Sequence, residues 1–92
     1  MLSLSDHVTI NIDILTTEID SEIVMMDVDS GNYYNLDEIG SVIWRRLAAP
    51  LAVERLCRDL ETLYDAPATV IEQDVLALLT RMEEKRLIRR VA

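Results

Sequence analysis

His7 and Cys57 are the residues of this sequence best suited to metal binding or nucleophilic chemistry, and each type occurs once. They lie far apart in the chain, so they cannot form a closed zinc site without carboxylates. The carboxylates offer no calcium loop, because Asp27, Asp29 and Asn32 do not continue into the EF-hand spacing. Cys57 falls on the apolar face of a predicted helix, where a buried thiol is favoured over a nucleophile. We therefore expect no catalytic residue, no metal site and no cofactor.

The size of the chain favours a binding module over an enzyme. Its 92 residues bury a modest core but leave little room for both a scaffold and a catalytic pocket. No apolar run approaches the length of about 20 residues that spans a bilayer, and the first residues lack the basic start of a secretion signal. A single cysteine suits a reducing compartment. We expect a cytoplasmic protein with no membrane partner.

The net charge of −8 is distributed unevenly along the chain. No Lys or Arg precedes Arg45, whereas nine Asp and Glu residues fall in that first part. Such a surface repels phosphate backbones, so we expect no nucleic-acid partner. Basic residues cluster near the end of the chain, where they also suit the dipole of a helix: Arg81, Lys85, Arg86, Arg89 and Arg90.

Tyr33 and Tyr34 are the first candidates for binding. They are neighbours in a predicted strand, so their rings point to opposite faces of the sheet and only one enters the core. One interpretation is a core aromatic beside a surface aromatic. The other makes the exposed ring, together with Asn35 and Leu36, part of an edge that binds a peptide.

Asp74 is the second candidate. It shares one side of a predicted helix with Ala77, Leu78 and Arg81 through spacings of three, four and seven residues. An isolated charge of this kind is most often a solvated helix residue. If that side faces the returning strand at Tyr33, the two elements enclose a groove with backbone groups on one wall and side chains on the other. Such a groove receives an extended peptide by strand addition.

A hairpin and a helix must position the tyrosines. The apolar run 23–26 predicts a strand, residues 29–32 form a turn, and residues 33–36 return as the second strand. Asp37 then caps a helix that runs to Leu47. Its predicted core face contains Ile39, Val42, Ile43 and Leu47, with Trp44 extending it.

The other segments complete a small α+β domain. Alternating apolar residues predict a strand from His7 to Leu15, joined to the hairpin by residues 16–21. Two more helices follow, over 51–64 and from Thr69 to Lys85, the latter with Glu72 as capping-box partner. The whole chain, 1–92, is expected to be one winged helix-turn-helix-like domain, with a three-stranded antiparallel sheet followed by three helices.

Several segments resemble the PqqD-like proteins, which are precursor peptide recognition elements in the biosynthesis of ribosomally synthesised and modified peptides (RiPPs). The opening resemblance lies in Val24-Met25-Met26-Asp27, in Ser30 to Asp37 and in Gly40-Ser41-Val42-Ile43-Trp44. Residues 60–65, 74–79 and 85–88 fit the same pattern, so the resemblance spans about residues 22 to 90. The chain is most similar to the standalone leader-binding proteins of lasso-peptide clusters.

The resemblance implies a winged-helix-like fold, no catalysis, and capture of the leader region of a precursor peptide. In the family, the leader adds as a strand beside the third strand and packs against the third helix. The bound precursor then passes to a transglutaminase-like leader peptidase, and a macrolactam synthetase closes the ring. The peptide-binding residues expected here are Tyr33, Tyr34, Asn35, Leu36, Asp74, Ala77, Leu78 and Arg81.

Two other functions remain open at this point. A winged-helix regulator that binds DNA needs a basic recognition helix, yet Arg55 and Arg58 stand beside Glu54, Asp59 and Glu61. An adaptor that pairs its open strand edge with another protein, or with a second copy, is the third possibility.

Overall fold

Three helices and two small antiparallel sheets make up the fold, seen in a computed structural model that describes residues 2–91. Within that range, no helix is long and apolar enough to cross a membrane. In chain order the elements are β1 (His7–Ile10), β2 (Ile14–Ile19), β3 (Glu22–Asp27), β4 (Asn32–Asn35), α1 (Glu38–Arg46), β5 (Leu51–Ala52), α2 (Val53–Leu63), α3 (Ala68–Glu84) and β6 (Ile88–Val91).

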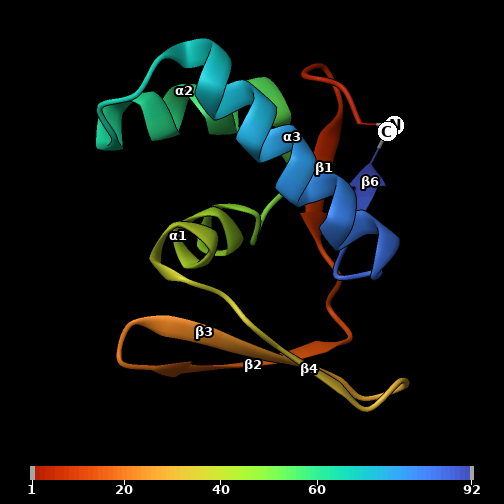
Figure 1. The fold of residues 1–92 in the computed structure, drawn as a ribbon. Helices are drawn as coiled ribbons and strands as arrows, with labels where there is room; N and C mark the ends of the chain where they lie inside the picture. Colours follow the sequence, from red (N-terminus) through yellow and green to blue (C-terminus); the bar gives the residue numbers. More distant parts are fainter. Residues whose placement is uncertain (1, 92) are drawn as a thin grey trace.

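The strands form two sheets, ordered β2-β3-β4 and β5-β1-β6. In Figure 1 the first sheet lies at the bottom with α1 above it, and α2 and α3 lie above α1. The second sheet brings both ends of the chain together beside α3. The predicted α+β class, with a three-stranded antiparallel sheet followed by three helices, is confirmed. The second sheet was not predicted.

The predicted strand from His7 to Leu15 is wrong, because this segment contributes to both sheets. β1 ends at Ile10, and the Asn11 side chain accepts a hydrogen bond from the Asp13 N–H at 3.0 Å, which closes a turn. Ile12 therefore lies outside the core with 85% of its surface exposed. Residues 16–21, predicted as a connection, hold most of β2, which pairs with β3 from Ile14 to Ile19.

Local capping fixes the hairpin and α1. Gly31 in the β3–β4 turn has φ of +75°, a conformation that glycine adopts without strain. Asp37 is the N-cap as predicted, since its carboxylate accepts from the Gly40 N–H at 2.7 Å. Ser41 then ties α1 to β3, because its hydroxyl oxygen accepts from the Ile23 N–H at 2.9 Å.

Neither α2 nor α3 begins at the residue that its sequence pattern predicted. α2 begins at Val53, because residues 51–52 pair with β1 as a short strand. α3 begins at Ala68 and its N-cap position is Pro67, so the capping box predicted at Thr69 is wrong. The buried apolar residues form one cluster that joins both sheets to all three helices. Its most enclosed members are Val8, Met25, Ile43, Leu47, Val53, Leu56 and Leu79.

Cys57 belongs to this core and should be chemically protected. Burial raises the pKa of its thiol to about 11 from a usual value near 9, and the charge of Glu72 adds to the rise. A shift of this size lowers the thiolate fraction about a hundredfold at pH 8. We expect a thiol reagent such as Ellman's reagent to react at least about a hundredfold faster after unfolding in urea. Equal rates for native and unfolded protein would contradict the buried position.

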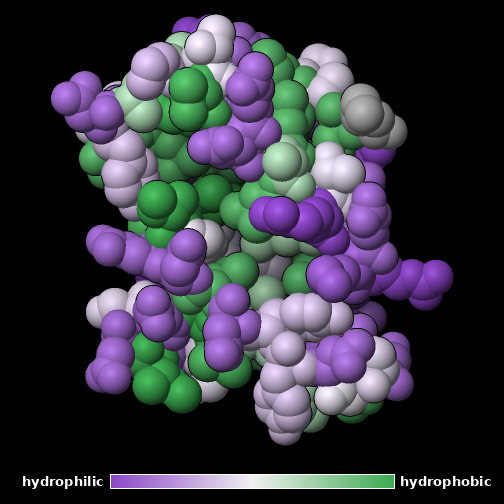
Figure 2. Space-filling view, viewed as in Figure 1, coloured by the Kyte–Doolittle hydropathy of each residue, from purple (hydrophilic) through white to green (hydrophobic). Residues whose placement is uncertain are grey.

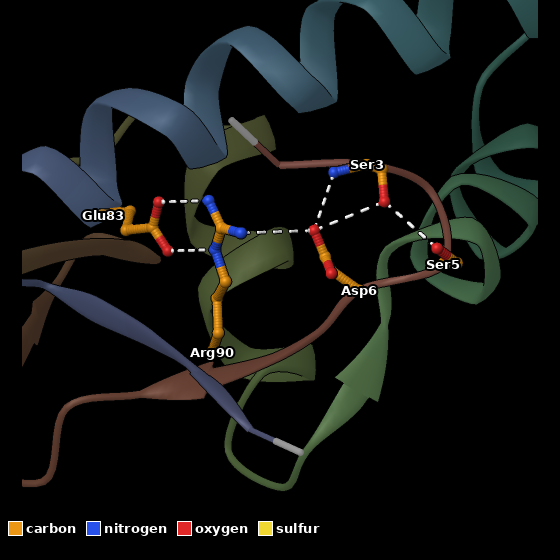
Figure 3. Close-up of polar contacts among 5 residues, drawn as sticks. All are labelled: Ser3, Ser5, Asp6, Glu83 and Arg90. Carbon is orange, nitrogen blue, oxygen red and sulfur yellow. Dashed lines mark hydrogen bonds and ion pairs between the residues drawn. The ribbon is translucent and has the colours of Figure 1, made fainter.

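Arg90 of β6 links the two ends of the fold to α3 (Figure 3). Its guanidinium donates to the two carboxylate oxygens of Glu83 at 2.7 and 3.1 Å and lies 3.7 Å from Asp6 Oδ2. The same Asp6 oxygen accepts from the Ser3 N–H at 2.9 Å. One cation therefore joins the segment before β1, the end of α3 and the last strand.

This cluster should make stability depend on acid pH. The Ser3 N–H lowers the pKa of Asp6, and the hydrogen bonds from Arg90 lower that of Glu83. Since both pKa values are lower in the folded state, the stabilisation is present above the unfolded values and is lost as pH falls through the folded ones. Melting temperature should therefore fall between about pH 5 and pH 2, and Arg90→Gln should flatten this fall. Arg58→Gln, which removes an exposed pair with Glu54, is the matched control.

Candidate functional site

The outer edge of β4 carries unpaired backbone groups. Among residues 2–91, β3 is the sole strand neighbour of β4. The Leu36 N–H donates to the Ile23 carbonyl at 2.9 Å, so Leu36 and, by alternation, Tyr34 direct their backbone groups toward β3. The N–H and C=O groups of Tyr33 and Asn35 consequently point away from the sheet. This edge offers two donors and two acceptors to an added strand.

A groove runs from the end of β4 to α3. It encloses about 380 Å³ and is bounded on one side by Asn35, Leu36 and the first turn of α1. The opposite side is α3, which presents Asp74, Leu78 and Arg81. The backbone of a strand edge and the side chains of a helix therefore face each other across a space open to solvent.

An apolar cavity adjoins this groove. It encloses about 190 Å³ between α1, the end of α2 and the first half of α3, and Ile39, Asp74 and Leu78 line both spaces. Figure 2 shows hydrophobic residues gathered in a hollow of the molecular surface, with hydrophilic residues around it. The remaining lining of the cavity is almost entirely apolar: Ile43, Leu60, Tyr64, Ala66, Val70, Ile71 and Val75.

Asp74 and Arg81 supply opposite charges along the helical wall. Both side chains are exposed, and neither forms an ion pair with another residue of the described chain. Seven residues of helix separate them by about 10 Å along the axis. The groove can therefore satisfy a cationic and an anionic group of one ligand at two separate points.

Tyr33 and Tyr34 point to opposite faces, as predicted. Tyr33 is 70% exposed, while Tyr34 is partly buried and packs against the core. The Lys85 ammonium lies 5.5 Å from the centre of the Tyr34 ring, which joins β4 to the end of α3 by a cation–π contact. Tyr34 therefore helps to hold the two walls of the groove in place.

The structure brings together five of the eight predicted residues and places three outside the groove lining. Asn35, Leu36, Asp74, Leu78 and Arg81 line the groove. Tyr33 contributes backbone to the free edge, and Tyr34 contacts the end of α3. Ala77 is exposed on α3 and lines neither space.

Ile39 is a site residue that the sequence analysis assigned to the core. It is 48% exposed and lines both the groove and the apolar cavity. The neighbouring Gly40 is the sequence feature that could have indicated this part of the site. A Cβ at this position would lie 3.1 Å from the Asp37 carboxylate and 3.3 Å from the Leu36 side chain. The glycine therefore permits the close approach of α1 to the end of β4.

Comparisons with known proteins were consistent with one family. The family described as "Coenzyme PQQ synthesis protein D (PqqD)" matches residues 22–88. Two similar curated proteins are the PqqA binding proteins of Xanthomonas campestris pv. campestris (strain B100) and Xanthomonas oryzae pv. oryzae (strain PXO99A), which are 37% and 35% identical over 54 residues. In each case the match covers 59% of this chain and 59% of the length of the relative.

Two solved structures share the fold over nearly the whole chain. TbiB1 in complex with the TbiA(beta) leader peptide is 26% identical with a TM-score of 0.83, covering 91% of this chain and 98% of TbiB1. Lasso peptide synthetase B1 complexed with the leader peptide is 24% identical with a TM-score of 0.79, covering 89% and 96%. The second likeness concerns the fold alone.

Proposed function

The chain belongs to the PqqD family, and from this premise we propose that it binds the leader region of a ribosomally synthesised precursor peptide. The observation that carries the proposal is the free edge of β4, which faces Asp74 and Arg81 across the groove. The leader adds as a fourth strand of the β2-β3-β4 sheet and bonds to the backbone of Tyr33 and Asn35. No covalent step is assigned to this chain.

Affinity and selectivity come from different parts of the site. Backbone hydrogen bonds along β4 hold any extended peptide, because they make little demand on sequence. Selection comes from the other wall, where Asp74 and Arg81 offer charges and the cavity beside Ile39 accepts an apolar side chain. Micromolar binding needs about 8 kcal/mol, which a short strand ladder and a few anchored side chains can supply.

The proposed role is tethering in the biosynthesis of a RiPP of the lasso-peptide type. Binding the leader raises the local concentration of the precursor near its processing enzymes. A transglutaminase-like leader peptidase receives the bound precursor and a macrolactam synthetase then closes the ring. Precursors of this kind are made on ribosomes, so we propose that the chain binds the leader in the cytoplasm. The binding unit is a single domain formed by residues 1–92.

The charges on α2 weigh against the regulator that binds DNA. Arg55 pairs with Asp59 at 3.3 Å and Arg58 pairs with Glu54 at 2.9 Å, while Arg46 of α1 reaches Asp59 at 3.1 Å. These carboxylates neutralise the cations that a recognition helix would direct to phosphates. With a net charge of −8, the surface favours a peptide over a nucleic acid.

A binding titration tests the proposal. Fluorescence anisotropy of a labelled leader, taken from the precursor encoded beside this gene, should rise to saturation with a micromolar Kd. A scrambled leader of the same composition and the core peptide alone are the controls. Absence of saturable binding to the leader, or equal binding to the scrambled peptide, would overturn the proposed function.

A further inference from the structure

One side of α3 carries opposite charges at its two ends. The residues on this side recur at spacings of four, three and four, and we call them the charged stripe: Asp74, Leu78, Arg81 and Lys85. The first three line the groove. The Lys85 ammonium lies 5.5 Å from the centre of the Tyr34 ring, so the fourth lies beside β4. The charged stripe is therefore acidic at one end, apolar at Leu78 and basic at the other end.

The basic end of the charged stripe lies beside β4, and the acidic end lies beside α1. Lys85 contacts Tyr34 within β4, whereas Asp74 lines the apolar cavity together with Ile39 of α1. Arg81 lines the groove but not that cavity, which agrees with its place between the two ends. In Figure 1 α3 descends toward the side on which β4 begins, and the chain leaves β4 toward α1. The direction of α3 is therefore opposite to that of β4.

The charges of the stripe are free to bind a ligand. Its three charged side chains are exposed, and none forms an ion pair with another residue in the range 2–91. Asp37 also lines the groove and adds negative charge on the α1 side. Glu83 faces the opposite side of α3, where it binds Arg90, and Glu84 lies about a quarter turn away from the stripe. The basic end therefore keeps its positive charge.

We propose that the charged stripe selects the leader by the order and spacing of the leader's own charges. This inference rests on the proposed function and deepens it, because it defines the class of peptide that the groove accepts. Every second residue of an added strand faces α3, at intervals of about 6.8 Å. The midpoint between Arg81 and Lys85 lies about 13.5 Å from Asp74 along the helix. Four residues of strand span this distance, so the leader carries a cation and an acid four positions apart.

Strand direction determines which of the two charges comes first in the leader. The pairings of β3 with β2 and with β4 are antiparallel, and an antiparallel ladder is slightly more stable than a parallel one. A leader antiparallel to β4 runs in the same direction as α3, so it passes Asp74 before Leu78 and Arg81. The leader therefore presents Lys or Arg, an apolar residue two positions later, and Asp or Glu two positions after that. Lys85 becomes a specificity-determining residue of the site.

The test pairs single changes in the leader with changes in the groove. The probe is the labelled leader of the precursor encoded beside this gene, and each of its charged residues is replaced in turn by Ala. Kd values are measured with wild type, with Asp74→Asn and with Arg81→Gln/Lys85→Gln. We expect one leader cation to couple to Asp74, and an acidic residue four positions closer to the leader's C-terminus to couple to the basic pair. Each coupling should be at least about fivefold in Kd.

Lys85 is tested separately against a cation of the other sheet. Lys85→Gln should weaken leader binding about threefold to tenfold. Lys85→Arg should keep the affinity of wild type, because arginine retains the charge and can also stack on the Tyr34 ring. Arg89→Gln is the matched control, since Arg89 of β6 is exposed and forms no ion pair among residues 2–91. Equal losses in Lys85→Gln and Arg89→Gln would assign the effect to net charge and overturn the role of the stripe.

Three other results would also overturn the inference. The first is an acidic residue that couples to the basic pair but precedes the cation coupled to Asp74. The second is the absence of coupling at both ends, and the third is saturable binding of a leader that lacks this order of charges. In each case saturable binding leaves the proposed function intact. If wild type shows no saturable binding to the leader, the proposed function fails instead, so the two failures are distinguishable.

Discussion

Asn35→Pro is expected to weaken leader binding at least about tenfold while the protein stays folded. The Asn35 N–H points away from β3, so proline removes a donor that the added strand needs but no bond of the existing sheet. One lost hydrogen bond costs about 1 kcal/mol, and the proline ring also occupies the space of the incoming strand. Proline is tolerated at such an edge position, so the melting temperature should change little. Anisotropy titration and a circular dichroism melt measure both quantities.

The control for this variant lies on the opposite edge of the same sheet. Thr17 pairs with Val24 of β3, and by alternation the N–H of Thr16 faces away from β3 at the free edge of β2. Thr16→Pro therefore removes an equivalent outward donor far from the groove. It should leave leader affinity unchanged, and a comparable loss in both proline variants would show that the β4 edge has no special role.

The second large effect is expected from the helical wall. Asp74→Ala/Arg81→Ala removes two exposed side chains of α3 that line the groove and have no ion-pair partner among residues 2–91. Charge-assisted contacts to a ligand contribute about 1.5 to 3 kcal/mol each, so the loss of both should lower leader affinity at least about a hundredfold. Stability should stay within about 0.5 kcal/mol of wild type, because both residues lie outside the core.

Leu78→Ala separates packing from recognition on the same wall. Leu78 is partly buried against the core and lines both the groove and the cavity, so its truncation should lower affinity and also destabilise the fold by about 1 to 2 kcal/mol. Gln73→Ala, an exposed change on α3 outside both linings, is the matched control. Unchanged leader affinity in the Asp74→Ala/Arg81→Ala variant would move the site away from this groove.

Local chemistry made the hairpin and the groove predictable. Asp37 is followed by a helical pattern and has a side chain suited to capping, so the start of α1 was placed correctly. Alternation in β4 correctly gave one exposed and one partly buried tyrosine. Helical spacing put Asp74, Leu78 and Arg81 on one side of α3, and the fold brings that side to Asn35.

The errors arose where a periodic pattern has two structural solutions. Alternation from Val8 to Ile14 fits one long strand, yet the Asn11 side chain closes a turn that divides it between two sheets. The β2–β3 turn was missed because Asp20 and Ser21 adopt positive φ values of 52° and 70° without the glycine that usually marks such turns. Periodicity also cannot separate a core residue from one lining a groove, which explains the error at Ile39.

Pairing between distant segments accounts for the second sheet. β5 has two residues and β6 has four, and each becomes a strand by pairing with β1. The propensity of so short a segment is weak beside the hydrogen bonds that its partner supplies. The Arg90 contacts to Glu83 and Asp6 depend on the same pairing, so sequence alone could not reveal them.

Amide hydrogen exchange at the two sheet edges tests strand addition most directly. The N–H groups of Tyr33, Asn35 and Thr16 all face outward in the free chain and should exchange rapidly. With saturating leader, we predict that exchange at Tyr33 and Asn35 slows at least about a hundredfold while Thr16 is unchanged. Slowing at Thr16 instead, or saturable leader binding with no protection at Tyr33 and Asn35, would contradict strand addition at β4.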